Sequence, residues 1–512
     1  MKPAGSNGRE AFATALGVLA GYQPDRPDRP PRYQYVVPGD GRGGPTLEGA
    51  GDPAVPRPGT IRAAAAALRA GPVRGTDLVE ESLLAVEKFD GQFNGVAHLM
   101  ADAARAEAAT LDEEAAAGRW RGPLHGIPIT VKDIIGVRGA PTCAGSAAYH
   151  DLPSTDAVAV ARARAAGAIV LAKVTTHEFA LGVTSPQSRN PHDPSRIPGG
   201  SSGGSAVAVS TGMGLGSIGT DTRASIRVPA ALSGVVGFKP TFGSVSTAGV
   251  VPLSWTMDHV ATMATTVEDA ALLLDVLLLD MPRASMATPL SSWAGAPVHG
   301  LRIGVPTSTF DGAEDEVQFA VDAALAALER RGCRLLASDR PGAHDLEAAN
   351  AAGLVVSRCE AAAFHRSLGA DRSLYWDEVA DQLDAADGVR ALDYIDAQRL
   401  RAELAESLLE VFDDVDLLAM PTVPIVAPPV DDFARHLMLL SRNAIPWSLV
   451  GFPAVSVPCG RPGGLPVGVQ LVAPPWREDL LVAAGTALED VLRNEAEALG
   501  GAANPPIRGG SK

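Results

Sequence analysis

The chain has 512 residues and a formal net charge of −16, with 46% hydrophobic and 20% charged residues. This composition is typical of a globular protein with a large apolar core, and the lack of a basic cluster argues against nucleic-acid partners. The four cysteines are scattered without a C-x-x-C spacing, so we expect neither a disulfide framework nor a metal site. No apolar run reaches the roughly 20 residues of a membrane helix, and we see no export signal. We therefore predict a cytoplasmic protein without a membrane partner.

The first 58 residues differ from the rest of the chain. An apolar stretch over residues 11–21 predicts a short amphipathic helix, and residues 23–58 are rich in proline and glycine. We interpret residues 1–58 as an N-terminal extension and residues 59–505 as one large domain. The sequence leaves open whether the chain forms a homodimer.

Helical and strand patterns alternate after residue 60. Helices are predicted over residues 61–71, 76–89, 98–117, 156–167, 317–332 and 391–412. Strands are predicted over residues 126–133, 168–173, 301–306, 416–421, 451–460 and 468–473. This alternation favours an α/β fold with a central mixed, mostly parallel twisted sheet covered by helices on both faces.

Three segments carry residues that could do chemistry, and each has an ordinary structural interpretation too. Lys132 ends an apolar strand, where a lysine either reaches solvent or is buried and serves as a base. Ser201 lies in P-G-G-S-S-G-G-S (198–205), which is either a flexible loop or the start of a helix. Ser225 lies in a turn, where a serine is either a local hydrogen-bonding group or a nucleophile. Ser225 does not lie in a G-x-S-x-G nucleophile motif.

Several motifs in order resemble the amidase signature family. They are G-P-L-H-G-I-P-I-T-V-K-D (122–133), R-I-P-G-G-S-S-G-G-S (196–205), G-T-D-T-R-A-S-I-R-V-P-A-A-L-S-G (219–234), M-P-T-V-P (420–424) and G-F-P-A-V-S-V-P-C-G (451–460). The resemblance spans roughly residues 59–490. It implies an amidase that hydrolyses the C–N bond of a small-molecule carboxamide and needs no cofactor.

The resemblance also implies a catalytic triad. Ser225 matches the nucleophile that forms the acyl-enzyme, Ser201 matches a proton relay that follows a cis peptide bond, and Lys132 matches the base. A lysine can accept a proton only when it is neutral, so burial must lower its pKa from about 10.4 to near neutrality. A serine hydroxyl needs such a base because it is a weak nucleophile.

The same resemblance assigns an oxyanion hole to the backbone N–H groups before the nucleophile, at Thr222, Arg223 and Ala224. Supporting positions match Ser202, Asp221 and Arg227.

This sequence has Arg223 and Ala224 where the family usually has two glycines. A side chain there adds strain if the backbone needs a positive φ. Arg223 could bind an anionic group of the substrate, could obstruct the site and weaken the enzyme, or could point to solvent or an internal ion pair.

Four functions stay open at this point. Hydrolysis of a small amide is our first choice. The others are an amide-forming acyltransferase, the A subunit of a glutamine-dependent aminoacyl-tRNA amidotransferase, and a catalytically impaired scaffold with this fold. The substrate is not identifiable from the sequence. Side chains considered for substrate contact, each with packing as an equal alternative, are Trp255, His259, His365, Tyr375 and Trp447.

Overall fold

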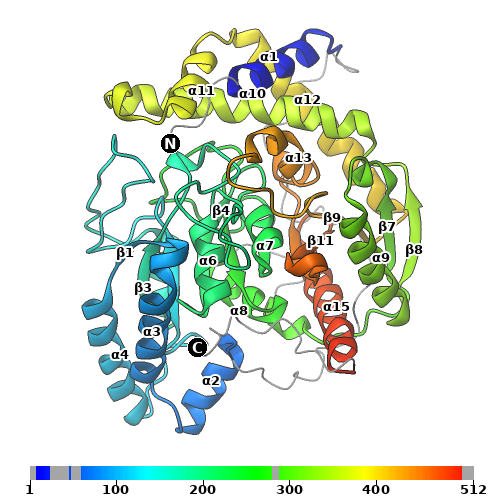
Figure 1. Ribbon diagram of the computed structural model, residues 1–512. Helices are drawn as coiled ribbons and strands as arrows, with labels where there is room; N and C mark the ends of the chain where they lie inside the picture. The colour runs from blue at the N-terminus through cyan, green and yellow to red at the C-terminus, as the bar shows by residue number, and fades with distance from the viewer. Residues whose placement is uncertain (1–6, 24–44, 46, 48–58, 280–287, 499–512) are drawn as a thin grey trace.

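The computed structural model describes residues 7–23, 45, 47, 59–279 and 288–498. Its centre is an eleven-stranded sheet within these residues (Figure 1). The strands are β1 (Val96–Leu99), β2 (Pro128–Lys132), β3 (Ile169–Val174), β4 (Gly216–Asp221), β5 (Val236–Lys239), β6 (His259–Ala264), β7 (Arg302–Pro306), β8 (Arg334–Ser338), β9 (Leu417–Pro421), β10 (Ala454–Gly460) and β11 (Val467–Val472). Their order across the sheet is β1-β3-β2-β4-β6-β5-β10-β11-β9-β7-β8.

The directions of the strands correct one part of the prediction. Among the described residues, the strands make four parallel pairings, within β3-β2-β4 and β9-β7-β8, and six antiparallel ones. The sheet is mixed, as predicted, but it is not mostly parallel. The main reason is that β6 inserts between β4 and β5 and runs against both, while a short turn joins β10 to β11 as a hairpin.

Helices cover both faces of the sheet, which confirms the α/β class. The helices are α1 (Asn7–Ala20), α2 (Ile61–Ala70), α3 (Gly75–Phe93), α4 (Ala101–Ala116), α5 (Val158–Ala165), α6 (Gly203–Thr211), α7 (Arg227–Ser233), α8 (Val267–Leu277), α9 (Asp315–Arg330), α10 (Ala343–Leu368), α11 (Asp377–Asp387), α12 (Ala391–Glu410), α13 (Leu437–Ser441), α14 (Ile445–Leu449) and α15 (Glu478–Ala498). Helices α6 and α7 pack together on one face, and α15 packs with α8 and α9 on the other.

The central strands are buried along their whole length because both faces are covered. Every residue of β2, β3, β4, β6, β9 and β11 is buried, and most of these residues are apolar. The charged residues among them are Lys173 within β3 and, at the ends of β2 and β4, Lys132 and Asp221. A buried charge needs polar partners, so these strand ends indicate a functional edge of the sheet.

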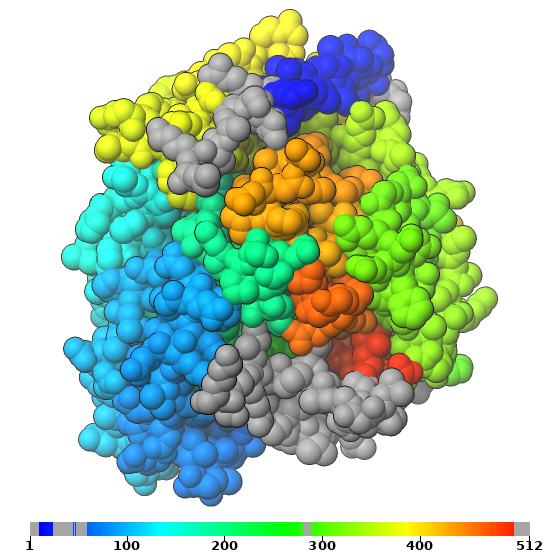
Figure 2. Space-filling model, viewed as in Figure 1, coloured from blue at the N-terminus to red at the C-terminus, as the bar shows by residue number. Residues whose placement is uncertain are grey.

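A layer of helices covers one end of the sheet, at the top of Figure 1. The long helix α10 packs against α11, α12 and α14, and α1 packs across α10, α11 and α12. Figure 2 shows α1 lying on this layer at the surface. Phe12, Ala15 and Leu19 form the buried face of α1 at helical spacing.

The predicted extension is described only in part. Helix α1 covers the stretch where a short helix was expected. Apart from residues 23, 45 and 47, the proline- and glycine-rich segment lies outside the described residues. The boundary at residue 58 stays a prediction. No helix in the described ranges combines the length and apolarity needed to cross a bilayer.

Candidate active site

The three predicted catalytic residues come from three segments at one edge of the sheet. Lys132 ends β2, Ser201 lies just before α6, and Ser225 lies in the loop between β4 and α7. Strands β2 and β4 are parallel neighbours, so their carboxyl ends lie at the same edge. Loops at this edge commonly form the binding sites of α/β proteins.

Lys132 is fully buried and contacts two hydroxyl groups. Its Nζ donates to Ser201 Oγ at 2.7 Å and to Thr220 Oγ1 at 2.8 Å. Burial lowers the pKa of Lys132 to about 7, against the opposing effect of the Asp221 and Asp258 carboxylates. A substantial fraction of the lysine is therefore neutral near pH 7 and can accept a proton from Ser201.

Ser201 is positioned through its backbone. The Gly200–Ser201 peptide bond is cis, and the Ser201 carbonyl accepts hydrogen bonds from the His177 N–H at 3.2 Å and Ser185 Oγ at 2.9 Å. A Cβ atom on Gly200 would lie 2.3 Å from the Thr184 carbonyl carbon, so only glycine fits at this close approach. These contacts leave the Ser201 hydroxyl directed at Lys132.

Ser225 lies beside the Ser201 segment. Its carbonyl accepts a hydrogen bond from the Ser202 N–H at 3.2 Å, and Ser202 Oγ donates to the Thr220 carbonyl at 3.1 Å. Ser202 thus joins the two serine-bearing loops to β4. Within the described residues the Ser225 hydroxyl has no hydrogen-bond partner, and the hydrogen bond to Ser201 that would complete the relay is not formed. Such bonds are often long before substrate is bound.

A buried ion pair supports residues 222–226, the loop that carries the predicted nucleophile Ser225 and is called the nucleophile loop below. Arg227 donates to Asp221 through Nε at 3.0 Å and Nη2 at 3.1 Å, and Asp221 also accepts from Ser448 Oγ and the Ile226 N–H. Both ionic side chains are fully buried. Burial alone would raise the pKa of Asp221, but the Arg227 guanidinium outweighs it and lowers that pKa well below its usual value. The carboxylate therefore stays ionised and holds both ends of the loop.

A second carboxylate holds the side chain of Thr222. Thr222 Oγ1 donates to Asp258 Oδ1 at 2.6 Å, and Asp258 Oδ2 accepts from the Leu253 and Ser254 N–H groups. Burial raises the pKa of Asp258 to about 6 although these hydrogen bonds oppose the shift. This contact ties the nucleophile loop to the segment before β6, and the sequence analysis did not anticipate it.

The strain considered for Arg223 and Ala224 is absent. The described non-glycine residues with positive φ do not include either one, so this expectation is wrong for this chain. The backbone takes a conformation that any residue adopts. The Arg223 side chain does not form an internal ion pair within the described residues, and its Nη2 donates to Asn350 Oδ1 on α10 at 2.6 Å.

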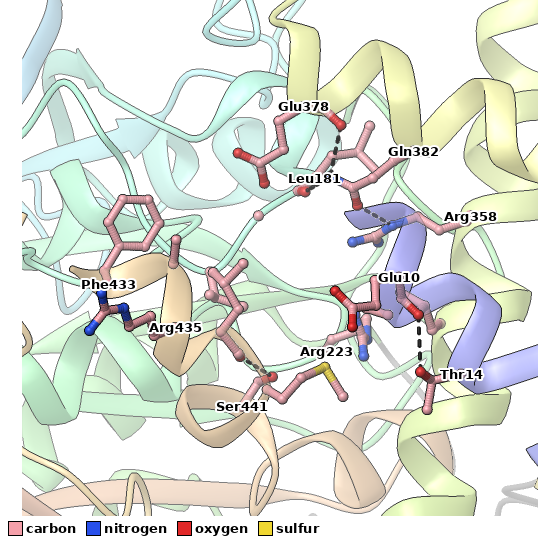
Figure 3. A pocket seen from close by; sticks show the side chains of 17 residues that line it. Glu10, Thr14, Leu181, Arg223, Arg358, Glu378, Gln382, Phe433, Arg435 and Ser441 are labelled. Atoms are coloured by element: carbon pink, nitrogen blue, oxygen red, sulfur yellow. Dashed lines mark hydrogen bonds between the residues drawn. The ribbon is translucent and has the colours of Figure 1, made fainter. Parts of the chain in front are cut away.

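Arg223 also lines a cavity of about 390 Å³ between the nucleophile loop and the helical layer (Figure 3). The cavity walls come from α1, the segment 181–183, α10, α11 and the segment 433–441. None of the five side chains considered for substrate contact is among its lining residues. His259, His365, Tyr375 and Trp447 are buried in packing, and Trp255 is 52% exposed.

Several contacts of the site were missed by the sequence analysis. Thr220 lies one position before Asp221 in the same motif, so its place on β4 could have been noticed. Asn350 and Asp258 lie in segments without a recognisable motif, and only the folded chain brings them to the loop. The described residues hold no group of three His, Cys, Asp or Glu side chains arranged for a metal ion.

Comparisons with known proteins agree with this geometry. The Amidase family pattern matches residues 77–482. The A subunit of glutamyl-tRNA(Gln) amidotransferase from Chloroflexus aurantiacus is 36% identical over 471 residues, covering 84% of this chain and 96% of that protein. An amidase of Pseudomonas putida is 37% identical over 418 residues, covering 78% and 89%. The solved structure of native peptide amidase from Stenotrophomonas maltophilia has a TM-score of 0.74 at 28% identity, covering 88% of this chain and 99% of that one. The chain therefore belongs to the amidase family and is a hydrolase of amide C–N bonds.

Proposed function

We propose that this enzyme hydrolyses the carboxamide of a small molecule through an acyl-enzyme on Ser225. The observation that carries the proposal is the buried Lys132, whose Nζ lies 2.7 Å from Ser201 Oγ and whose pKa is lowered to about 7 by burial. A lysine in this state serves as a base near neutral pH.

In the proposed reaction, Ser225 Oγ attacks the carboxamide carbon as its proton passes to Ser201, and the Ser201 proton passes to Lys132. The C–N bond then breaks, and Lys132 returns a proton through Ser201 to the leaving amine. Water takes the place of the amine and attacks the acyl carbon as its proton passes through Ser201 to Lys132. The bond between the acyl carbon and Ser225 Oγ then breaks, Lys132 returns the proton through Ser201 to Ser225 Oγ, and the carboxylic acid leaves. Each serine and the lysine end in their starting protonation state.

The turn before Ser225 supplies the proposed oxyanion hole. Among the described residues, the backbone N–H groups of Arg223, Ala224 and Ser225 donate no hydrogen bond. Unused N–H groups in a buried turn are suited to stabilise a negative charge that develops on the substrate oxygen. The sequence analysis also assigned Thr222 to the oxyanion hole. The Thr222 side chain donates to Asp258 and so holds the start of the turn.

The test is a screen of small carboxamides by product mass, with labelling of Ser225 by a fluorophosphonate. Ser225→Ala should lower turnover by a factor on the order of 10⁴ and abolish the label, because the nucleophile is lost. Ser205→Ala is the matched control, since it removes a buried serine hydroxyl of α6 that has no hydrogen-bond partner among the described residues, and it should keep the label. Full activity in Ser225→Ala would disprove the proposed mechanism.

A second candidate is transfer of ammonia from glutamine within an amidotransferase complex. It is supported by the similarity to the Chloroflexus aurantiacus protein, whose name describes one component of such an enzyme. The purified chain alone should then hydrolyse small amides poorly and require a partner protein for glutamine-dependent transfer. An amide-forming acyltransferase would instead give a new amide when a second amine is added.

We retain four other proposals from the sequence. Residues 1–58 are an extension of a domain that spans residues 59–505, of which 280–287 and 499–505 lie outside the described residues. The enzyme works in the cytoplasm on a small amide. It needs no metal or cofactor, and a homodimer is its simplest assembly.

A further inference from the structure

The cavity beside the nucleophile loop contains two arginines that lack a carboxylate partner. Arg358, on α10, is 6% exposed, and its Nε donates to Gln382 Oε1 at 2.7 Å. Arg223 donates to Asn350, and its Nε is buried without a partner. Neither guanidinium forms an ion pair within the described residues. Figure 3 shows Arg358 at the cavity wall, joined to Gln382, with Arg223 lining the same cavity.

The two cations affect each other. Burial and the nearby Arg358 guanidinium lower the pKa of Arg223 well below its usual value, and burial lowers the pKa of Arg358 to about 10. Arginine nevertheless keeps its charge in proteins, so the uncompensated charges raise the free energy of the empty cavity. An anion placed between them would relieve this cost.

Two carboxylates also line the cavity, but neither neutralises the arginines. Glu378 acts on Arg358 only at a distance, and its Oε1 lies 3.9 Å from His177 Nε2. Glu10, on α1, is exposed and lines the cavity, and it forms no ion pair with either arginine among the described residues. The remaining Arg435 is exposed and pairs with Asp432 at 3.0 Å. The buried part of the cavity therefore has an excess of positive charge.

The residues that line the cavity include neighbours in the chain of the catalytic loops, although Lys132, Ser201 and Ser225 do not line it themselves. Arg223 precedes Ser225 by two residues, and the lining segment 181–183 leads directly to Ser185, which donates to the Ser201 carbonyl. The other walls are mostly apolar, from Leu181, Val183, Leu354, Phe433, Leu437 and Met438. A ligand that fits has a short apolar skeleton with one anionic end.

We propose that Arg223 and Arg358 bind a carboxylate of the substrate, so that the enzyme acts on small amides that also carry an acid group. This inference rests on the proposed amidase function and names its substrate class. Guanidinium groups suit this role because each can make two parallel hydrogen bonds to a carboxylate.

The test compares short dicarboxylic monoamides, such as succinamic and adipamic acid, with neutral analogues in which a methyl ketone replaces the carboxylate. The acid should have at least about tenfold higher kcat/KM than its analogue, as expected for a charge-assisted hydrogen bond. Arg358→Met should reduce this ratio about tenfold, and Arg358→Lys should restore part of it. Arg366→Met, on the same helix but exposed and paired with Asp387, should leave the ratio unchanged.

Calorimetry on Ser225→Ala protein measures binding without turnover, so the two proposals can fail separately. Stronger binding of succinamic acid than of its analogue levulinamide supports the inference even if no substrate is cleaved. Equal binding, or a ratio that Arg358→Met does not change, overturns it. The amidase function still stands after either of these results if neutral amides are cleaved and Ser225 is labelled. If the Met variant does not fold, inhibition of the neutral reaction by added glutarate serves instead. Glutarate should inhibit the wild type and should inhibit Arg358→Lys more weakly, because lysine keeps the charge but not the two parallel hydrogen bonds. Equal inhibition of the two proteins overturns the inference.

Discussion

The catalytic centre and the wall of the adjacent cavity handle buried charge in opposite ways. In the centre, Arg227 and Asp221 neutralise each other, and Asp221 has four hydrogen-bond donors around it. In the wall, Arg223 and Arg358 have only neutral amide oxygens as their main partners. The charges of Asp221 and Arg227 balance without a ligand, whereas the wall has positive charge left over for one.

This difference separates the catalytic centre, which carries out the reaction, from the cavity wall, which recognises the substrate. The centre is built from the ends of β2 and β4 and the loops next to them, which belong to the rigid sheet. The wall takes Arg223 from the loop after β4, and its other residues come from the segment 181–183, α1, α10, α11 and the segment 433–441. A helical layer can change its side chains without disturbing the strands, so one catalytic centre can serve different substrates.

The largest effect is a loss of activity, and it is expected from a substitution of Lys132 in the catalytic centre. Lys132→Met should lower kcat/KM by a factor on the order of 10⁴, because no other base contacts Ser201 among the described residues. Lys132 must be neutral to act, and its pKa is about 7. The wild-type kcat/KM should therefore rise with pH through about 7 and level off above it, which a pH–rate profile checks.

The matched control for this profile is the buried lysine Lys173, which pairs with Asp133 at 2.9 Å and forms no hydrogen bond with Ser201 or Ser225. Lys173→Met should reduce stability rather than shift the pH profile. A profile whose rising limb stays near pH 7 in Lys132→Met would contradict the assignment of the base.

The next effect concerns stability in the centre. Arg227→Met leaves the Asp221 carboxylate buried without its ionic partner, so the free energy of unfolding should fall by about 3–5 kcal/mol. Chemical denaturation at neutral pH measures the loss. Because the folded state lowers the pKa of Asp221, the wild-type contribution is present above about pH 4 and fades as the pH falls further.

The smallest effect is a change in stability, and it is expected from an arginine-to-methionine substitution in the cavity wall. Arg358→Met removes a buried cation that has no carboxylate partner, and methionine fills similar space, so the free energy of unfolding should change by less than about 1 kcal/mol. The same denaturation experiment compares it with Arg227→Met. Equal losses in the two variants would show that the centre and the wall do not differ in the way described above.

The sequence predicted six of the eleven strands in the described sheet and missed β1, β4, β5, β6 and β8. Local patterns placed strands such as β2 and β11 within a few residues, since continuous apolar runs bounded by turns are a local signal. The insertion of β6 between β4 and β5 depends on a long connection after β5, where no local pattern states which neighbour the strand will choose. The share of parallel pairings was therefore overestimated.

The candidate site shows the same limit. Motifs pointed to Lys132, Ser201 and Ser225, and the structure brings Lys132 and Ser201 into contact. The partners of Arg223 could not be found this way, because Asn350 lies 127 residues further along the chain on a helix with no motif. The backbone strain considered at Arg223 was also beyond a sequence argument, since φ depends on how the whole turn is held.

Helix α1 gives the cavity a wall that lies outside the part of the chain matched by the family pattern. Glu10, Ala11 and Thr14 line the cavity, yet the match begins at residue 77. Mutations in the first two dozen codons can therefore alter which molecules enter, while every catalytic motif stays untouched. Different parts of this chain encode the choice of substrate and the chemical reaction. One of them can therefore change during evolution while the other stays the same.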